Sequence, residues 1–208
     1  MKKIIALILV IGCVFAFASC NLIFGNNDGG NGHANDNKGT VADVQSAIDA
    51  SAPAKATIKV KLESALGDLN GSYNVTYNED GSATVNYSYE VFNAFGEDAT
   101  KNGEKSTYSD TVTVSASGEL NKPIYGASAV EAVSFDINLD ESKLSSASVV
   151  ASVLTAKVEA ANTAAVLGVA ISSDADLCIT TGAGRVTSVV ITYTTESGPV
   201  TITATYNY

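Results

Sequence analysis

Apolar and polar residues alternate along most of the chain after residue 54. The alternation occurs at Ile58–Leu62, Tyr73–Tyr77, Val85–Val91, Val112–Val114, Val133–Leu139, Val189–Tyr193 and Val200–Tyr208. A strand with this pattern has one apolar face and one face of Thr, Asn and Ser. Such strands are typical of an antiparallel sheet that is packed on one side and wet on the other.

Short turn sequences separate these runs, at positions 79–82, 101–103, 182–184 and 196–199. Short turns join antiparallel neighbours, whereas parallel strands need crossover helices, which the pattern does not offer. Gly182, Gly184 and Ser188 superficially match a dinucleotide-binding motif. That motif requires a helix to start there, and an apolar strand pattern follows instead. We therefore predict a hairpin turn at 182–184.

Two segments have helical signals. Thr40 and Asp43 have the spacing of an N-cap with an acidic third residue, a relative of the capping box. Apolar residues follow at helical spacing, namely Val41, Val44, Ala47 and Ile48, and Pro53 closes the segment. We expect a short amphipathic helix there.

The stretch from Leu144 to Gly168 is rich in Ala, Ser and Val, and its composition also suits one long helix. Its β-branched residues and the alternation around Leu154 favour a strand near Val149–Glu159. A short helix is then expected, with Asn162 as its N-cap and Gly168 as its stop.

These elements predict a mainly β domain of about 170 residues (positions 40–208), with eight to ten strands and only two short helices. So little helix cannot cover the apolar face of one long flat sheet. We expect a strongly curved antiparallel sheet or half-barrel, with an N-terminal helix and one short later helix. A closed barrel and a β-sandwich are the alternatives.

The first 20 residues have the features of a secretion signal. Lys2 and Lys3 precede an uncharged run, Ile4–Ala18, which is short for a membrane span and suits the apolar region of a signal peptide. The run ends in Phe17-Ala18-Ser19-Cys20, which resembles the lipobox of bacterial lipoproteins. The resemblance implies cleavage after residue 19 and lipidation of Cys20. An ordinary signal peptide and an uncleaved anchor helix are the alternatives.

The resemblance divides the chain into a signal peptide (1–19), a lipidated cysteine with a tether (20–39) and the β domain (40–208). Gly25–Gly39 consists almost entirely of Gly, Asn and Asp, so it cannot bury enough apolar surface to fold. Gly-rich statistics give the tether a span of roughly 25 Å. His33 lies within it and has no partner at metal-ligand spacing, so we expect no metal site.

Charge and cysteine content exclude several functions. Without residues 1–19 the chain has 22 acidic residues and 10 basic ones (12 less Lys2 and Lys3), a net charge of −12. Such a charge opposes nucleic-acid binding. Cys178 lies in an apolar run and has no histidine partner in the domain, because His33 is the only histidine. We interpret Cys178 as a small buried hydrophobe and expect no enzyme, catalytic residue, metal or cofactor.

The predicted order of an initial helix, hairpins, a short helix and final hairpins resembles LolA/LppX-type lipoproteins. The resemblance implies a curved sheet around a hydrophobic cavity, and tyrosines on strands could line that cavity or belong to the core. We expect a non-catalytic, lipid-anchored protein on the extracytoplasmic face of the cell membrane that binds a lipid or other apolar ligand. The alternative is a cell-surface structural or protein-interaction domain without a ligand. No protein partner is indicated.

Overall fold

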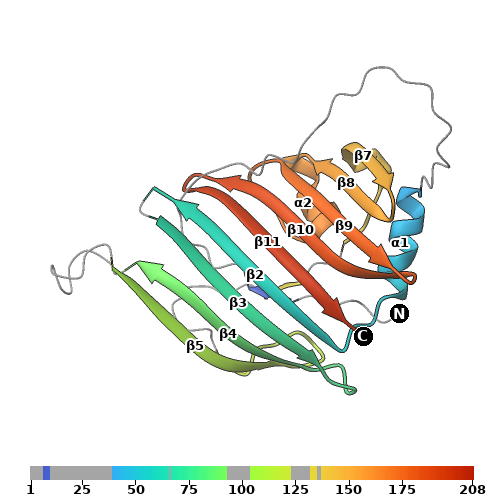
Figure 1. The fold of residues 1–208 in the computed structure, drawn as a ribbon. Coiled ribbons are helices and arrows are strands. Elements are labelled where there is room, and N and C mark those ends of the chain that lie inside the picture. Colours follow the sequence, from blue (N-terminus) through green and yellow to red (C-terminus); the bar gives the residue numbers. More distant parts are fainter. Residues whose placement is uncertain (1–6, 10–38, 66, 93–103, 123–131, 135–136) are drawn as a thin grey trace.

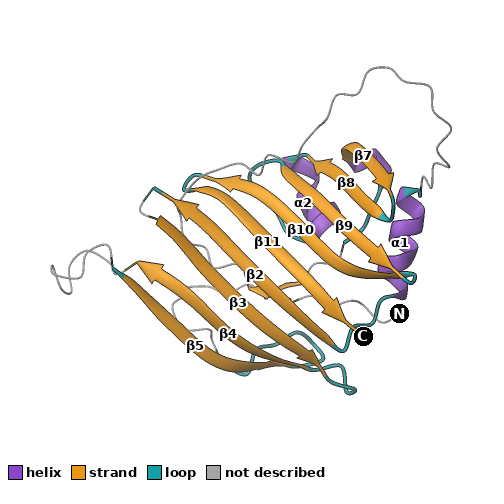
Figure 2. Ribbon diagram, in the orientation of Figure 1, coloured by secondary structure: helices purple, strands orange, loops and turns teal. Residues whose placement is uncertain are grey.

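A computed structural model describes residues 7–9, 39–65, 67–92, 104–122, 132–134 and 137–208. The predicted Lys101–Gly103 turn, Cys20 and His33 lie outside these residues. Most described residues belong to one nine-stranded antiparallel sheet with two short α-helices (Figures 1 and 2). Its strands are β2 (Lys55–Ser64), β3 (Gly67–Tyr77), β4 (Ala83–Phe92), β5 (Lys105–Val114), β7 (Leu144–Val150), β8 (Val153–Val158), β9 (Ala175–Gly182), β10 (Arg185–Thr195) and β11 (Gly198–Asn207). The fold is mainly β, as the alternation predicts.

The sheet consists of two meanders that meet in its middle. Its strand order is β5-β4-β3-β2-β11-β10-β9-β8-β7, and every neighbouring pair is antiparallel. Consecutive strands pair with one another from β2 to β5 and from β7 to β11, and β11 then pairs with β2. The sheet is not closed into a barrel, since β5 and β7 form its two edges. The nine strands form one sheet and not the two packed sheets of a sandwich. A separate two-stranded sheet pairs β1 (Leu7–Leu9) with β6 (Ala132–Ser134).

Helix α1 (Val41–Ala50) begins at a capping box. The Thr40 hydroxyl accepts a hydrogen bond from the Asp43 backbone N–H at 3.2 Å, and the Asp43 carboxylate accepts one from the Thr40 N–H at 2.8 Å. The buried residues of α1 are Val41, Val44, Ala47 and Ile48. Figure 1 shows α1 at the end of the sheet that carries β7, where it contacts β7, β9 and β10.

The second helix, α2 (Thr163–Leu167), lies between β8 and β9 in the chain and follows a 3-10 turn at Ala160–Asn162. It ends at Gly168, whose φ of 73° is left-handed, as the stop signal predicts. Asn162 is its N-cap residue but makes no capping bond with its side chain. The Asn162 amide instead donates to the Lys143 carbonyl at 3.3 Å, so it joins α2 to the start of β7.

The strand expected near Val149–Glu159 is present only as β8, and its first residues are wrongly assigned. The chain reverses at Ala151 and Ser152, so the segment is the hairpin of β7 and β8. Both turn residues have positive φ (47° and 67°) although neither is Gly, Asn or Asp. The turn is held by the Thr181 N–H, which donates to the Ser152 carbonyl at 2.9 Å. The residue types at 151 and 152 therefore do not indicate a turn, because the bond that stabilises it comes from Thr181, which is distant in the sequence.

The run expected as a strand at Val133–Leu139 is only partly one. Its first residues belong to β6, whereas Ile137 and Leu139 are buried outside any strand. The Leu139 N–H donates to the Gln45 side chain of α1 at 2.7 Å. The Asn138 N–H donates to the Val166 carbonyl of α2 at 2.9 Å. This segment packs between the two helices because its apolar side chains help to cover the sheet there.

The core differs between the two ends of the sheet. At the β7–β10 end, the buried faces of the strands are covered by α1, α2 and residues 137–139. At the β3–β5 end, four tyrosines stack on one another across three strands. Their ring centroids are 6.2 Å apart for Tyr73–Tyr87, 5.9 Å for Tyr87–Tyr89 and 5.7 Å for Tyr89–Tyr108. Offset aromatic pairs at such distances add to the stability gained from burial alone.

Candidate functional site

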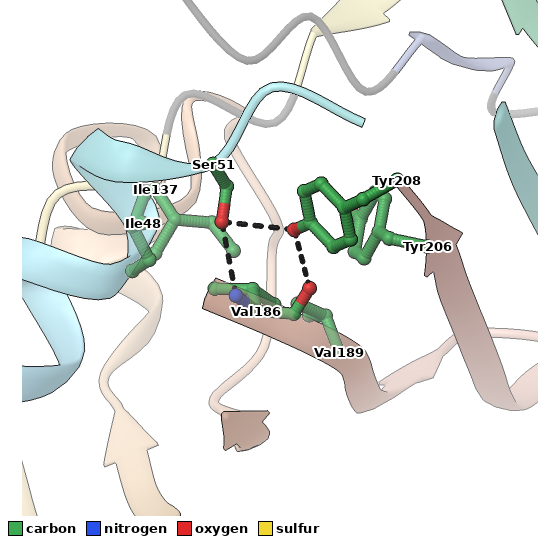
Figure 3. Close-up of a pocket in the computed structure, with 7 residues that line it drawn as sticks. All are labelled: Ile48, Ser51, Ile137, Val186, Val189, Tyr206 and Tyr208. Atoms are coloured by element: carbon green, nitrogen blue, oxygen red, sulfur yellow. Dashed lines mark hydrogen bonds between the residues drawn. The ribbon is translucent and has the colours of Figure 1, made fainter. Parts of the chain in front are cut away.

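An apolar pocket lies where the end of α1 meets the start of β10 and the end of β11 (Figure 3). Its walls come from four segments that are far apart in the sequence. The lining residues are Ile48, Ser51, Ile137, Val186, Val189, Tyr206 and Tyr208. The pocket is half open to solvent and contains about 300 Å³ of empty space, counted out to its mouth. Its enclosed part has room only for a group the size of a water molecule or a methyl.

Alternation and a β-bulge position the β10 side of the pocket. The register between β9 and β10 shifts between Val186 and Ser188. Val186 and Val189, three positions apart, are therefore both buried. The bulge turns the Val186 backbone toward the end of α1, where its N–H and carbonyl meet side chains from the two ends of the domain.

The polar atoms at the pocket are bonded to one another. Ser51 is 3% exposed, and its hydroxyl donates to the Ala47 carbonyl at 2.7 Å. The same oxygen accepts from the Val186 N–H at 2.9 Å and lies 2.9 Å from the Tyr208 hydroxyl. The Tyr208 hydroxyl also lies 2.5 Å from the Val186 carbonyl (Figure 3). With these groups satisfied, the pocket presents mainly carbon surface to a ligand.

Arg185 provides a positive charge beside this carbon surface. It is the only arginine in the chain, and its side chain is exposed. The centre of its guanidinium lies 4.9 Å from the centroid of the Tyr208 ring, which is one wall of the pocket. None of the carboxylates in the described part of the chain forms an ion pair with Arg185. The guanidinium is therefore positioned to meet an acidic group of a ligand at the rim.

Burial gives the pocket tyrosine a hydroxyl that stays protonated. Desolvation raises the pKa of Tyr206 above its ordinary value, and nearby Tyr77 and Tyr208 add to this effect. Burial likewise raises the pKa of Tyr193, to about 12. A neutral tyrosine offers a ligand apolar ring surface and a weakly polar hydroxyl. The hydroxyls of Tyr206 and Tyr193 are therefore neither bases nor nucleophiles at neutral pH.

The tyrosines divide into two groups that the sequence could not separate. Tyr73, Tyr87 and Tyr89 are at most 4% exposed and pack on one another, so they are core residues. Tyr206 and Tyr208 line the pocket instead. All of these tyrosines alternate with other residues on strands. Only the position of α1 makes the tyrosines at the end of β11 pocket residues and those of β4 core residues.

Cys178 corrects one sequence interpretation. Its neighbours Leu177 and Ile179 are buried, but Cys178 is only half-buried and lies on the opposite face of β9. Its directly paired neighbours are Thr155 and Val190. Burial raises the pKa of its thiol, which disfavours the reactive thiolate.

The described segments hold no cluster of metal ligands and no membrane-spanning helix. No three His, Cys, Asp or Glu side chains gather there in a way that could hold a metal ion. Within the same segments, no helix is both long and apolar enough to cross a membrane.

Comparison with known proteins adds no relative. No protein-family model matches the chain, and none of the curated proteins searched is significantly similar to it.

Proposed function

We propose that the protein is a lipid-anchored, extracytoplasmic binding module without catalytic activity. It is held to the membrane through Cys20, and it binds an apolar ligand with an acidic head group. The observation that carries this proposal is the pocket of carbon surface bounded by α1, β10 and β11, with the Arg185 guanidinium over the ring of its lining residue Tyr208.

The dimensions of the pocket favour one kind of ligand. Because the enclosed part holds only a methyl-sized group, it suits the end of an alkyl chain and not a bulky ring. The rest of the ligand's alkyl chain would lie in the open part of the pocket, against Tyr206 and Tyr208. A carboxylate or phosphate head would then meet the Arg185 guanidinium, whose planar donors match such groups.

Titration of the purified full chain with dodecanoate and dodecanol tests the proposal, with calorimetry as the measurement. Both probes should bind, and dodecanoate should bind several-fold more tightly. Val189→Leu adds one methylene and fills the enclosed part, so it should weaken both probes about fourfold, since one buried methylene contributes about 0.8 kcal/mol. Arg185→Gln should remove only the preference for dodecanoate.

Val190→Leu is the matched control, because Val190 is adjacent in β10 but lies on the other face of the sheet. Lys59→Gln is the control for charge. Lys59 is an exposed cation on β2, on the same outer face of the sheet as Val190. Failure of both probes to bind, or equal weakening by Val189→Leu and Val190→Leu, would show that this pocket is not the ligand site.

A further inference from the structure

The two edges of the nine-stranded sheet are protected very differently. The chain that follows β5 folds back along the outer side of this strand. The Thr113 N–H donates to the Asn121 side chain and the Thr113 carbonyl accepts from the Asn121 N–H, both at 2.9 Å. Val114 and Leu120 form an antiparallel bridge, and Lys122 pairs with Asp110 at 2.7 Å. The end of the β5 edge is therefore covered by the protein itself.

The β7 edge has none of these protections within the described residues. Its seven residues, Leu144–Val150, include no charged side chain and no proline. Its one described sheet neighbour is β8, so every second residue directs its backbone N–H and carbonyl outward. Positions 145–148 are exposed, and Val150 is 61% exposed. Natural edge strands normally carry lysine, proline, a β-bulge or a covering loop to prevent pairing with another chain. The only such feature of β7 in the described residues is a register shift between Leu144 and Ser146, at its very start.

Gly39, the last tether residue in the chain and the one that the structure describes, lies beside this same edge. A Cβ atom built on Gly39 would lie 2.9 Å from Cγ1 of Val149, so the backbone of Gly39 packs directly on β7. The residues between Cys20 and Gly39 connect this point to the proposed anchor. Copies anchored in one membrane therefore present their β7 edges at a similar height, and the membrane raises the effective concentration of one edge near another.

A second copy also fits the charge of the edge. The whole chain carries a net charge of −10, so most of its surface repels another copy. The uncharged β7 strand is free of this repulsion. Antiparallel pairing of β7 with itself is an isologous contact, closed by a two-fold axis, and it satisfies the outward backbone groups of both copies at once.

We propose that β7 is a self-association edge, through which two membrane-anchored copies join their nine-stranded sheets into one. The two-fold axis passes near Ala147, the central residue of the strand. The inference rests on the proposed anchor but not on the ligand pocket, so loss of ligand binding would leave it intact.

Disulfide trapping in membranes tests this pairing. Directly opposite residues of an antiparallel pair have Cα atoms about 4.5–5.5 Å apart, which is within the range of a disulfide. The full chain carrying Ala147→Cys should form a disulfide-linked dimer under mild oxidation, seen on a non-reducing gel at twice the mass of one chain. Thr107→Cys, an exposed position on β5, is the matched control and should stay monomeric. The unsubstituted chain gives the background from Cys178.

A second variant separates pairing from random collision. Adding Ser148→Lys to Ala147→Cys places two like charges close to the axis, so most of the dimer should disappear. Since Ser148 is exposed, the midpoint of urea unfolding should not shift measurably. Three results would overturn the proposal: no dimer with Ala147→Cys, an equal dimer with Thr107→Cys, or a disulfide to a different protein. Membrane fractionation of the same samples shows separately whether the anchor is present.

Discussion

Two tyrosine hydroxyls have very different surroundings. Tyr73 is fully buried, and its hydroxyl has no hydrogen-bond partner among the described residues. Its ring lies over Gly71, where an added Cβ would come within 3.2 Å of the ring. Tyr208 is 43% exposed, yet its hydroxyl bonds to both Ser51 and Val186. Burial alone therefore does not tell which hydroxyl stabilises the fold.

Removing each hydroxyl should have opposite effects. Tyr73→Phe keeps the stacked ring and removes a buried unpaired group, so the free energy of unfolding should stay constant or rise by about 1 kcal/mol. Tyr208→Phe leaves the Val186 carbonyl without the hydroxyl donor, so the free energy of unfolding should fall by about 1–2 kcal/mol. Urea unfolding of both variants measures the difference. A marked loss of stability in Tyr73→Phe would contradict the absence of a partner.

At the scale of elements, the strength of the sequence signal follows the position of each strand in the sheet. The inner strands β2, β4, β10 and β11, none of which is an edge strand, alternate clearly because one face is packed and one is wet. The edge strands bury less, so Leu144–Val150 and the first part of Lys105–Val114 have no regular pattern. This is why the sequence predicts one strand near Val149–Glu159, where the structure has the end of β7, a turn and β8.

The turn of that hairpin gives a second prediction. Ala151 and Ser152 hold left-handed conformations that Asn and Gly adopt at lower cost. Ala151→Asn combined with Ser152→Gly should raise the free energy of unfolding by about 1 kcal/mol, since the backbone bond from Thr181 is retained. Thermal unfolding measures the change.

Gly184→Ala is the matched comparison, because Gly184 has a φ of 73° in the turn between β9 and β10. It should lower stability by a similar amount. If the Asn-Gly turn were less stable than the native one, strain at 151 and 152 would not be the relevant feature.

At the scale of the whole molecule, the sequence could predict the class of fold but not the pocket. Alternation and turn residues are enough to predict an antiparallel sheet, because the residues of each strand show by themselves which of its faces is apolar and which is polar. The pocket depends on Ile48, Ile137, Val189 and Tyr208 meeting in space. Nothing in the spacing of these residues indicates that meeting, since it depends on the packing of α1 at the start of β10.

The proposed anchor makes a prediction for the intact protein. Cys20→Ala should remove the acyl groups, seen by intact mass, and should release the protein from membranes washed at alkaline pH. Each buried methylene of an acyl chain contributes about 0.8 kcal/mol to membrane binding, and two or more chains hold a protein stably. Cys178→Ala should keep both lipid and membrane association. A Cys20→Ala protein that remains in the washed membranes would contradict the lipobox interpretation.

The pairing of β2 with β11 has a consequence for how the protein is made. Thr57 and Thr205 bond across this pair although they are 148 positions apart. During synthesis β2 is therefore an open, half-apolar strand until β11 appears, and the two meanders cannot join before then. Such long-range closure slows folding and exposes pairing surfaces to aggregation. The nine-stranded sheet can therefore close only after β11 has been made, long after the synthesis of β2.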